Sequence, residues 1–455
     1  MCLRLFFLTF GLSATLLMAG RFCIISLAAE AGAAAAAGDP TLAEPTSAKG
    51  YLERGNAYWG RGDRAKALAD YDKAIQLDPR LGDAYLNRGL IHYEQNELDK
   101  ALADYDVGLR LNPKSAQGHY NRGVVRLEKA DYDSAIADFD EVLRLEPRFI
   151  AAYVQRGSAW HHKREYDKAV AEFNEAIRHN PQYSDAYAHR GLTWHAKGDR
   201  DKALADYQEA IRLDESNALA YCNRGLVWEE KGIFFEALRD YDKAIQIEPE
   251  LLDAYISRGS LLYRQHRFEA AAKDFDKAVQ LDPKNAQLYY LRGSAYWGLA
   301  QADKAMLEKA LADYTEAVRL NPRDALTYSA RGQALADKGQ YDKALADYQE
   351  ALRLEPKLAD AHDRMAMLLA TCPQPTLRDP QKAVEHAEQA CQLSEGKQWE
   401  YLETLAVAQA AAGRFSEAVK SLSKAVALAP DSEKARLEAD MVSYRAGRLR
   451  GDTGK

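Results

Sequence analysis

The 455-residue sequence is poor in cysteine, and none of its cysteines has the CxxC spacing of a metal or redox motif. Cys2 and Cys23 belong to a distinct N-terminal segment, which leaves Cys222, Cys372 and Cys391 in the rest of the chain. Three widely spaced cysteines are an odd number and do not make a disulfide framework. Burial of apolar surface must therefore stabilise the fold.

Positive charge does not dominate either, because the sequence has 61 Lys and Arg residues and 68 Asp and Glu residues, for a net charge of −7. The basic surface that nucleic-acid-binding proteins carry is missing. The sequence also lacks the GxxxxGK, HExxH, GxSxG and GxGxxG signatures of nucleotide-binding proteins and hydrolases. We therefore expect no catalysis, no cofactor and no nucleic-acid partner.

Long apolar runs occur only at the N-terminus, where Leu5–Met18 follows Arg4 and a second, shorter run follows Arg21. An Ala-rich spacer comes next. A short charged start, an apolar stretch and small residues are typical of a bacterial-type export signal. Residues 1–38 are therefore interpreted as an export signal or membrane anchor with its spacer, and residues 39–47 as a linker.

Cleavage of this segment is expected between Gly20 and Ala37. The alternative is an uncleaved anchor, because residues 5–29 are long enough to span a bilayer if Arg21 is tolerated. In both cases we expect the protein to be exported to the periplasm or cell envelope. In the second case its N-terminus also tethers it to the membrane.

What the chain has in abundance is repetition, with a period of 34 residues from Ala48 onward. In nine consecutive units position 8 is Gly, position 20 is Ala and position 24 is Tyr or Phe, while position 32 is Pro in eight of the nine. Positions 4, 8 and 11 share one helix face and positions 20, 24 and 27 share a face of a second helix. Pro ends that second helix. Each unit is thus a helix–turn–helix that buries its apolar face against its neighbours.

This pattern resembles the tetratricopeptide repeat. The resemblance implies an all-α solenoid of about eleven helix–turn–helix repeats over residues 48–432, wound as a right-handed superhelix with a concave groove lined by first helices. The segment LATCP…RDP…KAVEHAEQAC further resembles the closing repeats of exported bacterial tetratricopeptide proteins. Residues 433–455 are expected to form a capping helix and tail. The repeats begin near residues 48, 82, 116, 150, 184, 218, 252, 286, 325, 359 and 399.

Two repeats depart from the period. Repeat 8 has five extra residues, which we expect to lengthen the turn between its helices. Repeat 10 holds TCPQPTLRDP, whose three prolines predict a rigid loop.

Position 7 is Arg in all nine regular repeats and position 23 is always acidic. Repeats 10 and 11 lose both partners together, with Met365 and His386 in one and Leu405 and Ser421 in the other. We infer a structural ladder of partly buried Arg–carboxylate pairs, since guanidinium can bind a carboxylate through two hydrogen bonds. The alternative is that both are ordinary surface charges. The pairs are Arg54–Asp70, Arg88–Asp104, Arg122–Asp138, Arg156–Glu172, Arg190–Asp206, Arg224–Asp240, Arg258–Asp274, Arg292–Asp313 and Arg331–Asp347.

Two other groups of residues invite a metal interpretation. The recurring DxD pairs, such as Asp70 and Asp72, lie about 200° apart on a helix and cannot grip one ion. We expect the second Asp to pair with nearby lysines. Histidines gather in repeats 4 and 5, where they either converge on a transition metal or are solitary surface residues. We assign no metal site, and Trp160, Trp194 and Trp228 are expected in the core; the histidines are His161, His162, His189 and His195.

The resemblance also implies that positions 2, 5, 6, 9, 12 and 13 of each first helix face the groove. These positions are rich in asparagine, aromatic and acidic residues, which suit an extended, neutral or basic peptide. The Lys–Asn clamp that some family members use for acidic tails is not matched, because Leu52 occupies its Lys position. The candidate groove residues are Asn56, Trp59, Asn87, Tyr93, Tyr120, Asn121, Asn223, Glu229, Tyr263, Tyr290 and Trp297.

The sequence therefore predicts a non-catalytic scaffold or adaptor that binds extended segments of protein partners. The alternative is a cell-envelope module that binds glycans or accompanies an enzyme, which aromatic groove residues would also suit.

Overall fold

The computed structural model describes residues 44–300 and 302–449. The predicted export signal lies outside the described residues, as does most of the predicted linker. In the described part no helix is both long and apolar enough to cross a membrane.

The described residues form 23 α-helices, which pack in pairs as an α-solenoid of about eleven repeats, and one short 3-10 helix. The first helices of the pairs are α3 (Ala48–Gly60), α5 (Gly82–Glu94), α7 (Ala116–Glu128), α9 (Ile150–His162), α11 (Ser184–Ala196), α13 (Ala218–Glu230), α15 (Leu252–Arg264), α17 (Ala286–Leu299), α19 (Ala325–Asp337), α21 (Ala359–Thr371) and α23 (Trp399–Ala411).

The second helices are α4 (Arg64–Leu77), α6 (Leu98–Leu111), α8 (Tyr132–Leu145), α10 (Tyr166–His179), α12 (Arg200–Leu213), α14 (Phe234–Ile247), α16 (Phe268–Leu281), α18 (Ala305–Leu320), α20 (Tyr341–Leu354), α22 (Pro380–Leu393) and α24 (Phe415–Leu428). The last helix, α25 (Asp431–Arg445), packs on α24 and covers the end of the array.

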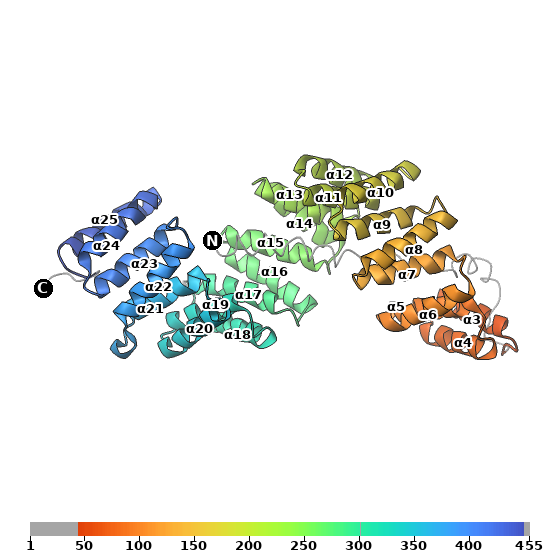
Figure 1. Cartoon of the computed structure of the whole chain (residues 1–455), viewed down its shortest axis with the longest axis horizontal. Coiled ribbons are helices and arrows are strands. Elements are labelled where there is room, and N and C mark those ends of the chain that lie inside the picture. Colours follow the sequence, from red (N-terminus) through yellow and green to blue (C-terminus); the bar gives the residue numbers. More distant parts are fainter. Residues whose placement is uncertain (1–43, 301, 450–455) are drawn as a thin grey trace. The chain divides into compact units, whose positions relative to one another are not determined.

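The chain divides into an N-terminal unit, which ends at Asp253, and a C-terminal unit, which begins at Ala254. Within each unit the second helix of a repeat packs on its own first helix and on the first helix of the next repeat (Figure 1). Neighbouring first helices also contact one another, more extensively than second helices do. The first helices therefore line the inner face of each unit.

The glycine at position 8 and the aromatic ring at position 24, which recur in every regular repeat, set the distance between the paired helices. At Gly225 an added Cβ would lie 2.7 Å from Cε1 of Tyr241, and at Gly157 it would lie 2.7 Å from Cε1 of Phe173. Any side chain at position 8 would displace the buried ring at position 24, so only glycine permits this close approach. Alanine at position 20, such as Ala101, is fully buried between the same helices.

In several repeats the residue at position 4 forms a hydrogen bond to the preceding repeat. The hydroxyl groups of Tyr153 and Tyr187 donate to the carbonyl oxygens of Pro147 and Pro181, at 3.1 and 3.3 Å. The proline at position 32 thus both ends a helix and supplies an acceptor to the next repeat. These contacts fix the angle at which one repeat follows another.

The turn between paired helices requires a left-handed residue at position 15. Glycine occupies it in several repeats, including Gly198 with φ of 86° and Gly232 with φ of 76°. Ala130 and Arg164 adopt the same conformation with φ of 59° and 61°, although Cβ disfavours it. Packing of the paired helices therefore imposes the left-handed conformation even on residues that disfavour it.

The two irregular repeats keep the helix pair. In repeat 8 the extra residues lengthen both helices as well as the turn, since α17 continues to Leu299 and α18 has 16 residues. In repeat 10 the proline-rich segment forms the 3-10 helix Pro375–Leu377 before α22, which begins at Pro380 with Asp379 as its N-cap.

Candidate functional site

The inner face is where the predicted groove residues lie, and the structure divides them by exposure. Asn56, Trp59, Glu229, Tyr263 and Trp297 are partly exposed. The other predicted groove side chains are buried, with at most 9% of their surface exposed, contrary to the expectation that they are open to a partner: Asn87, Tyr93, Tyr120, Asn121, Asn223 and Tyr290.

Ring packing explains this correction for the aromatic residues. Tyr120 is 1% exposed and lies between Phe139 and Phe149, with ring centroids 5.9 and 5.1 Å away. Tyr290 packs against Tyr314 at 6.0 Å. These rings fill the space between first and second helices, so they form the floor of the inner face rather than its surface.

Three of the four candidate asparagines are committed to contacts within the protein, whereas Asn223 is buried and its amide has no hydrogen-bond partner among the described residues. Asn56 Oδ1 accepts hydrogen bonds from Asn87 Nδ2 at 2.8 Å and from the Tyr71 hydroxyl at 2.9 Å. Asn121 Oδ1 accepts from Gln117 Nε2 at 2.8 Å. These amides stabilise the packing of successive helices, so they are less available to a bound peptide than the sequence indicates.

In the C-terminal unit a polar network crosses the inner face of three repeats. Trp297 Nε1 donates to Asp337 Oδ2 at 2.7 Å, and Gln333 Nε2 donates to Asp337 Oδ1 at 2.8 Å. Arg364 contacts Gln333 Oε1 at 3.4 Å and Asp360 at 2.7 Å. We call Trp297, Gln333, Asp337, Asp360 and Arg364 the inner-face network. Sequence reasoning found only Trp297. Asp360 and Arg364 lie in repeat 10, to which the groove positions were not extended, whereas Gln333 and Asp337 occupy positions 9 and 13 of repeat 9 and were not chosen as candidates.

The arginines at position 7 bind the acids at position 23 through two hydrogen bonds in most repeats. Arg190 donates from Nε and Nη2 to the Asp206 carboxylate at 2.8 and 2.6 Å, and Arg224 donates to Asp240 at 2.8 Å from both nitrogens. Asp240 is 1% exposed. Equivalent ion pairs join the other seven pairs: Arg54–Asp70, Arg88–Asp104, Arg122–Asp138, Arg156–Glu172, Arg258–Asp274, Arg292–Asp313 and Arg331–Asp347.

A second set of acids completes the ladder. Nη1 of Arg88 contacts Asp72 of the preceding repeat at 2.7 Å, and Arg292 contacts Asp276 at 2.7 Å. The prediction that the second Asp of each DxD pairs with lysine is thus wrong for Asp72. An arginine reaches two carboxylates because its planar fork offers donors in two directions. The signal was present in the sequence, since Arg88 lies 16 residues from both of its partners.

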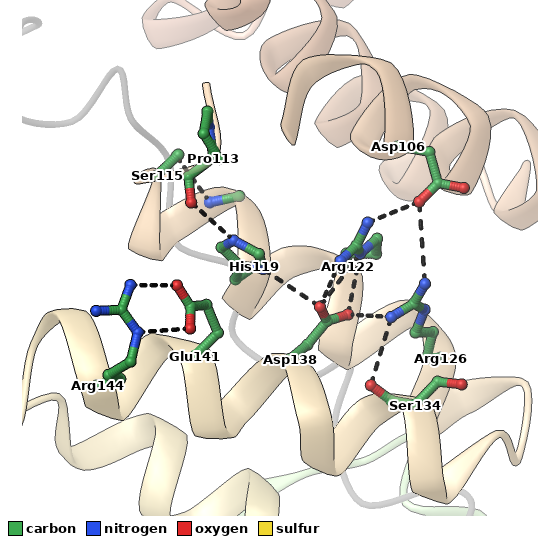
Figure 2. Close-up of polar contacts among 11 residues, drawn as sticks. Asp106, Pro113, Ser115, His119, Arg122, Arg126, Ser134, Asp138, Glu141 and Arg144 are labelled. Atoms are coloured by element: carbon green, nitrogen blue, oxygen red, sulfur yellow. Dashed lines mark hydrogen bonds and ion pairs between the residues drawn. The ribbon is translucent and has the colours of Figure 1, made fainter. Parts of the chain in front are cut away.

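Asp138 is the most heavily bonded acid of the ladder (Figure 2). It accepts from Arg122 at 2.6 and 3.0 Å and from Arg126 at 2.7 Å, and it lies 3.3 Å from His119 Nδ1. Burial raises the pKa of Asp138, but hydrogen bonds from His119 and Arg122 and the nearby arginine charges outweigh it, so its pKa lies below the usual value. The group stays ionised and holds repeat 3 together.

The histidines of repeats 4 and 5 are held by separate partners. His161 Nδ1 lies 2.8 Å from Thr193 Oγ1, His189 Nδ1 lies 2.8 Å from the Asp185 carbonyl, and His195 lies 3.1 Å from Glu230. Burial lowers the pKa of His161 to about 3. Within residues 44–300 and 302–449, no group of three or more His, Cys, Asp or Glu residues could hold a metal ion.

The tryptophans at position 11 are only partly buried. Lys168 and Lys163 lie over the ring of Trp160 at 4.3 and 5.3 Å, and Lys202 and Lys197 cover Trp194 at the same distances. These rings therefore contribute to the core on one side and to cation–π contacts on the other.

Comparison with protein families matches the description "Tetratricopeptide repeat" at residues 52–116, 120–192, 218–251, 313–346 and 376–433, and "TPR repeat" at 194–232, 259–299 and 332–369. No match was found among curated protein sequences.

Several solved structures are similar in fold. A tetratricopeptide repeat protein from Parabacteroides merdae is 21% identical with a TM-score of 0.50, covering 55% of this chain and 99% of that chain. Yeast Tom70 is 18% identical with a TM-score of 0.41, covering 89% and 97%. YrrB, described as a TPR protein with an unusual peptide-binding site, is 27% identical with a TM-score of 0.32, covering 40% and 95%.

Tetratricopeptide repeats generally mediate binding between proteins, and their scaffold is typically non-catalytic. The matched segments together span more than half of the chain and include helices of both units. This protein belongs to the tetratricopeptide repeat family.

Proposed function

We propose that this protein is a non-catalytic scaffold whose inner face binds an extended, neutral or basic segment of a partner protein. The observation that carries the proposal is the inner-face network, where a partly exposed indole stands beside a carboxylate. The Asp337 side chain is exposed and attracts a positive group, while Trp297 offers a flat apolar surface. Gln333 donates to Asp337 and accepts from Arg364, so its amide orders the network around the carboxylate.

The N-terminal unit offers similar chemistry at separate places on its own inner face. Trp59 is partly exposed and has Arg64 over its ring at 5.1 Å. Glu229 is partly exposed and accepts a hydrogen bond from the Tyr241 hydroxyl at 3.0 Å. Aromatic and acidic groups thus recur along the first helices, which suits a segment that contacts several repeats.

The test is binding of the full-length chain to sets of extended peptides that differ only in charge. We expect neutral and basic peptides to bind and acidic ones to bind more weakly, with affinity for basic peptides falling as salt rises. Trp297→Ala and Asp337→Asn should weaken binding. Trp194→Ala is the matched control, because that ring belongs to the N-terminal unit and is covered by Lys197 and Lys202. Preference for acidic peptides, or equal binding by all variants, would refute the proposal.

The partly exposed aromatic rings also favour a second candidate, a cell-envelope module that binds glycans. Trp59 and Trp297 could each stack on a sugar ring, as aromatic side chains with an open face do. Oligosaccharides tested with the same variants distinguish the two, since glycan binding should depend on Trp297 but not on the Asp337 charge.

We also propose that the protein is exported, either by cleavage of residues 1–38 or with that segment kept as a membrane tether. The apolar run after Arg4 supports this proposal. Fractionation of the native host, with determination of the mature N-terminus, tests it. Recovery of an intact N-terminus from the soluble cytoplasmic fraction would refute both forms.

A further inference from the structure

Repeat 10 replaces the arginine–carboxylate pair with two histidines that face each other. His362 of α21 and His386 of α22 bring their Nδ1 atoms to 2.9 Å, with ring centroids 5.1 Å apart. Met365 stands where the ladder has arginine. Beside the apolar core of this repeat, the two helices are therefore joined by a contact between two imidazoles, side chains that can gain a proton in acid.

The hydrogen-bond partners fix how many protons this contact can hold. His362 Nε2 lies 3.1 Å from the Pro356 carbonyl, which can only accept, so this nitrogen carries a hydrogen. In the neutral pair His362 Nδ1 then accepts, and His386 Nδ1 donates. One further proton fits on His386 Nε2 without loss of either bond. A second would place a donor against a donor, between two positive rings.

Repeat 3 provides the opposite arrangement at the same position. His119 Nε2 lies 3.1 Å from the Pro113 carbonyl, and its Nδ1 lies 3.3 Å from Asp138 Oδ1 (Figure 2). Both partners are acceptors, so the charged imidazolium satisfies both. A protonated ring is thus compatible with both contacts in repeat 3, whereas two protonated rings are not compatible with the contact in repeat 10.

We propose that repeat 10 is a pH-sensitive joint, in which the pair of His362 and His386 clamps α21 to α22 and releases them when both rings are protonated. The joint bears on the inner face, because α21 also carries Arg364 of the inner-face network. Release of α21 would loosen Arg364 from Gln333 and change the surface offered to a partner. This consequence rests on the proposed function, but the joint itself does not.

The charged groups near the joint bear on how readily His386 gains a proton. Among the described residues, His362 of α21 and Glu385 and Lys382 of α22 are the groups whose charges act on His386. Burial comes first and, with the His362 charge, lowers the pKa of His386. Asp363 follows His362 on α21, and burial raises its pKa to about 7. Its protonation in acid removes a buried charge, so it opposes loosening.

The test is amide hydrogen exchange of the full-length chain at about pH 7.5 and about pH 5, corrected for the intrinsic pH dependence of exchange. We expect exchange in peptides from α21 and α22 to rise several-fold in acid, while peptides from α7 and α8 do not change. The acid-induced rise should disappear in His386→Asp, which reproduces the pairing of repeat 3, and in His362→Tyr, which reproduces the usual hydroxyl donor.

Asp363→Asn is the matched control and should keep the rise. Equal exchange of α21 and α22 at both pH values would overturn the proposal, as would a rise that persists in His386→Asp. Circular dichroism in the far ultraviolet verifies that each variant is folded at both pH values. Peptide binding is measured separately, so that a failed joint and a failed binding face give different results.

Discussion

Removal of Arg190 alone from the Arg190–Asp206 pair should destabilise repeat 5 more than removal of both partners. Arg190 donates two hydrogen bonds to Asp206, and the side chains are 21% and 9% exposed. Its third contact is the neutral Asn174 Oδ1 at 2.6 Å. This pair suits the test because, among the described residues, no second carboxylate loses its partner when the arginine is removed.

The magnitude follows from burial. Two unit charges about 4 Å apart attract by about 4 kcal/mol at an effective dielectric constant of 20. Loss of one partner of a fully buried pair costs about 3–5 kcal/mol, and the partial exposure of Arg190 reduces this to about 2 kcal/mol for Arg190→Met. Asp206→Leu should cost about 1 kcal/mol, since the freed guanidinium can reach water. The double variant should lose no more than about 1 kcal/mol.

The assay must report on repeat 5, because a repeat array need not unfold in one step. Opening free energies from amide exchange in α11 and α12 give the four corners of a double-mutant cycle. We expect a coupling energy of about 2 kcal/mol. Additive losses, with a coupling energy below about 0.5 kcal/mol, would refute a structural role for the ladder. The exposed pair of Lys197 and Asp167 is the control and should couple by less than about 0.5 kcal/mol.

Three further outcomes are expected. Gly157→Ala should destabilise repeat 4 by about 1–3 kcal/mol in urea denaturation, because the new Cβ meets the buried ring of Phe173, whereas Gly60→Ala, with open space around it, should not. Ala130→Gly should stabilise repeat 3 by up to about 1 kcal/mol, because φ is 59° there, and a lower urea midpoint would contradict this. Burial raises the pKa of Asp363 to about 7, so the free energy of unfolding falls as pH rises above the lower pKa that this group has in the unfolded chain. Asp363→Asn should therefore raise the melting temperature at about pH 8 but not at about pH 4.

The sequence predicted the fold well because its strongest signals are local and repeated. Glycine at position 8 and a ring at position 24 must meet, and the first helices begin at the predicted repeat starts, from Ala48 to Trp399. Extra residues in repeat 8 were harder to place. Helix-forming residues such as Met306 and Leu307 extended α18 instead of remaining in the turn.

The inner face was less predictable, because a position number gives the direction of a side chain and not its depth. Tyr120 points toward the inner side, yet Phe139 and Phe149 cover it. Arg364 was missed because repeat 10 departs from the pattern that identified the other positions. Contacts between repeats depend on how far long side chains reach, and a single repeat does not contain that information.

In several repeats the arginine at position 7 makes contacts in two directions. As Arg88 shows, it binds an acid within its own repeat and a side chain of the preceding repeat, so the same residue fixes both the helix pair and the junction. The acid within the repeat never varies in sign, whereas the residue across the junction changes from Asp72 to Asn174. Helix pairs are thus held uniformly while junctions differ in strength, since a hydrogen bond to a neutral amide is weaker than one to a carboxylate. Each repeat is then held rigidly, while the strength of the contact between neighbouring repeats varies along the array.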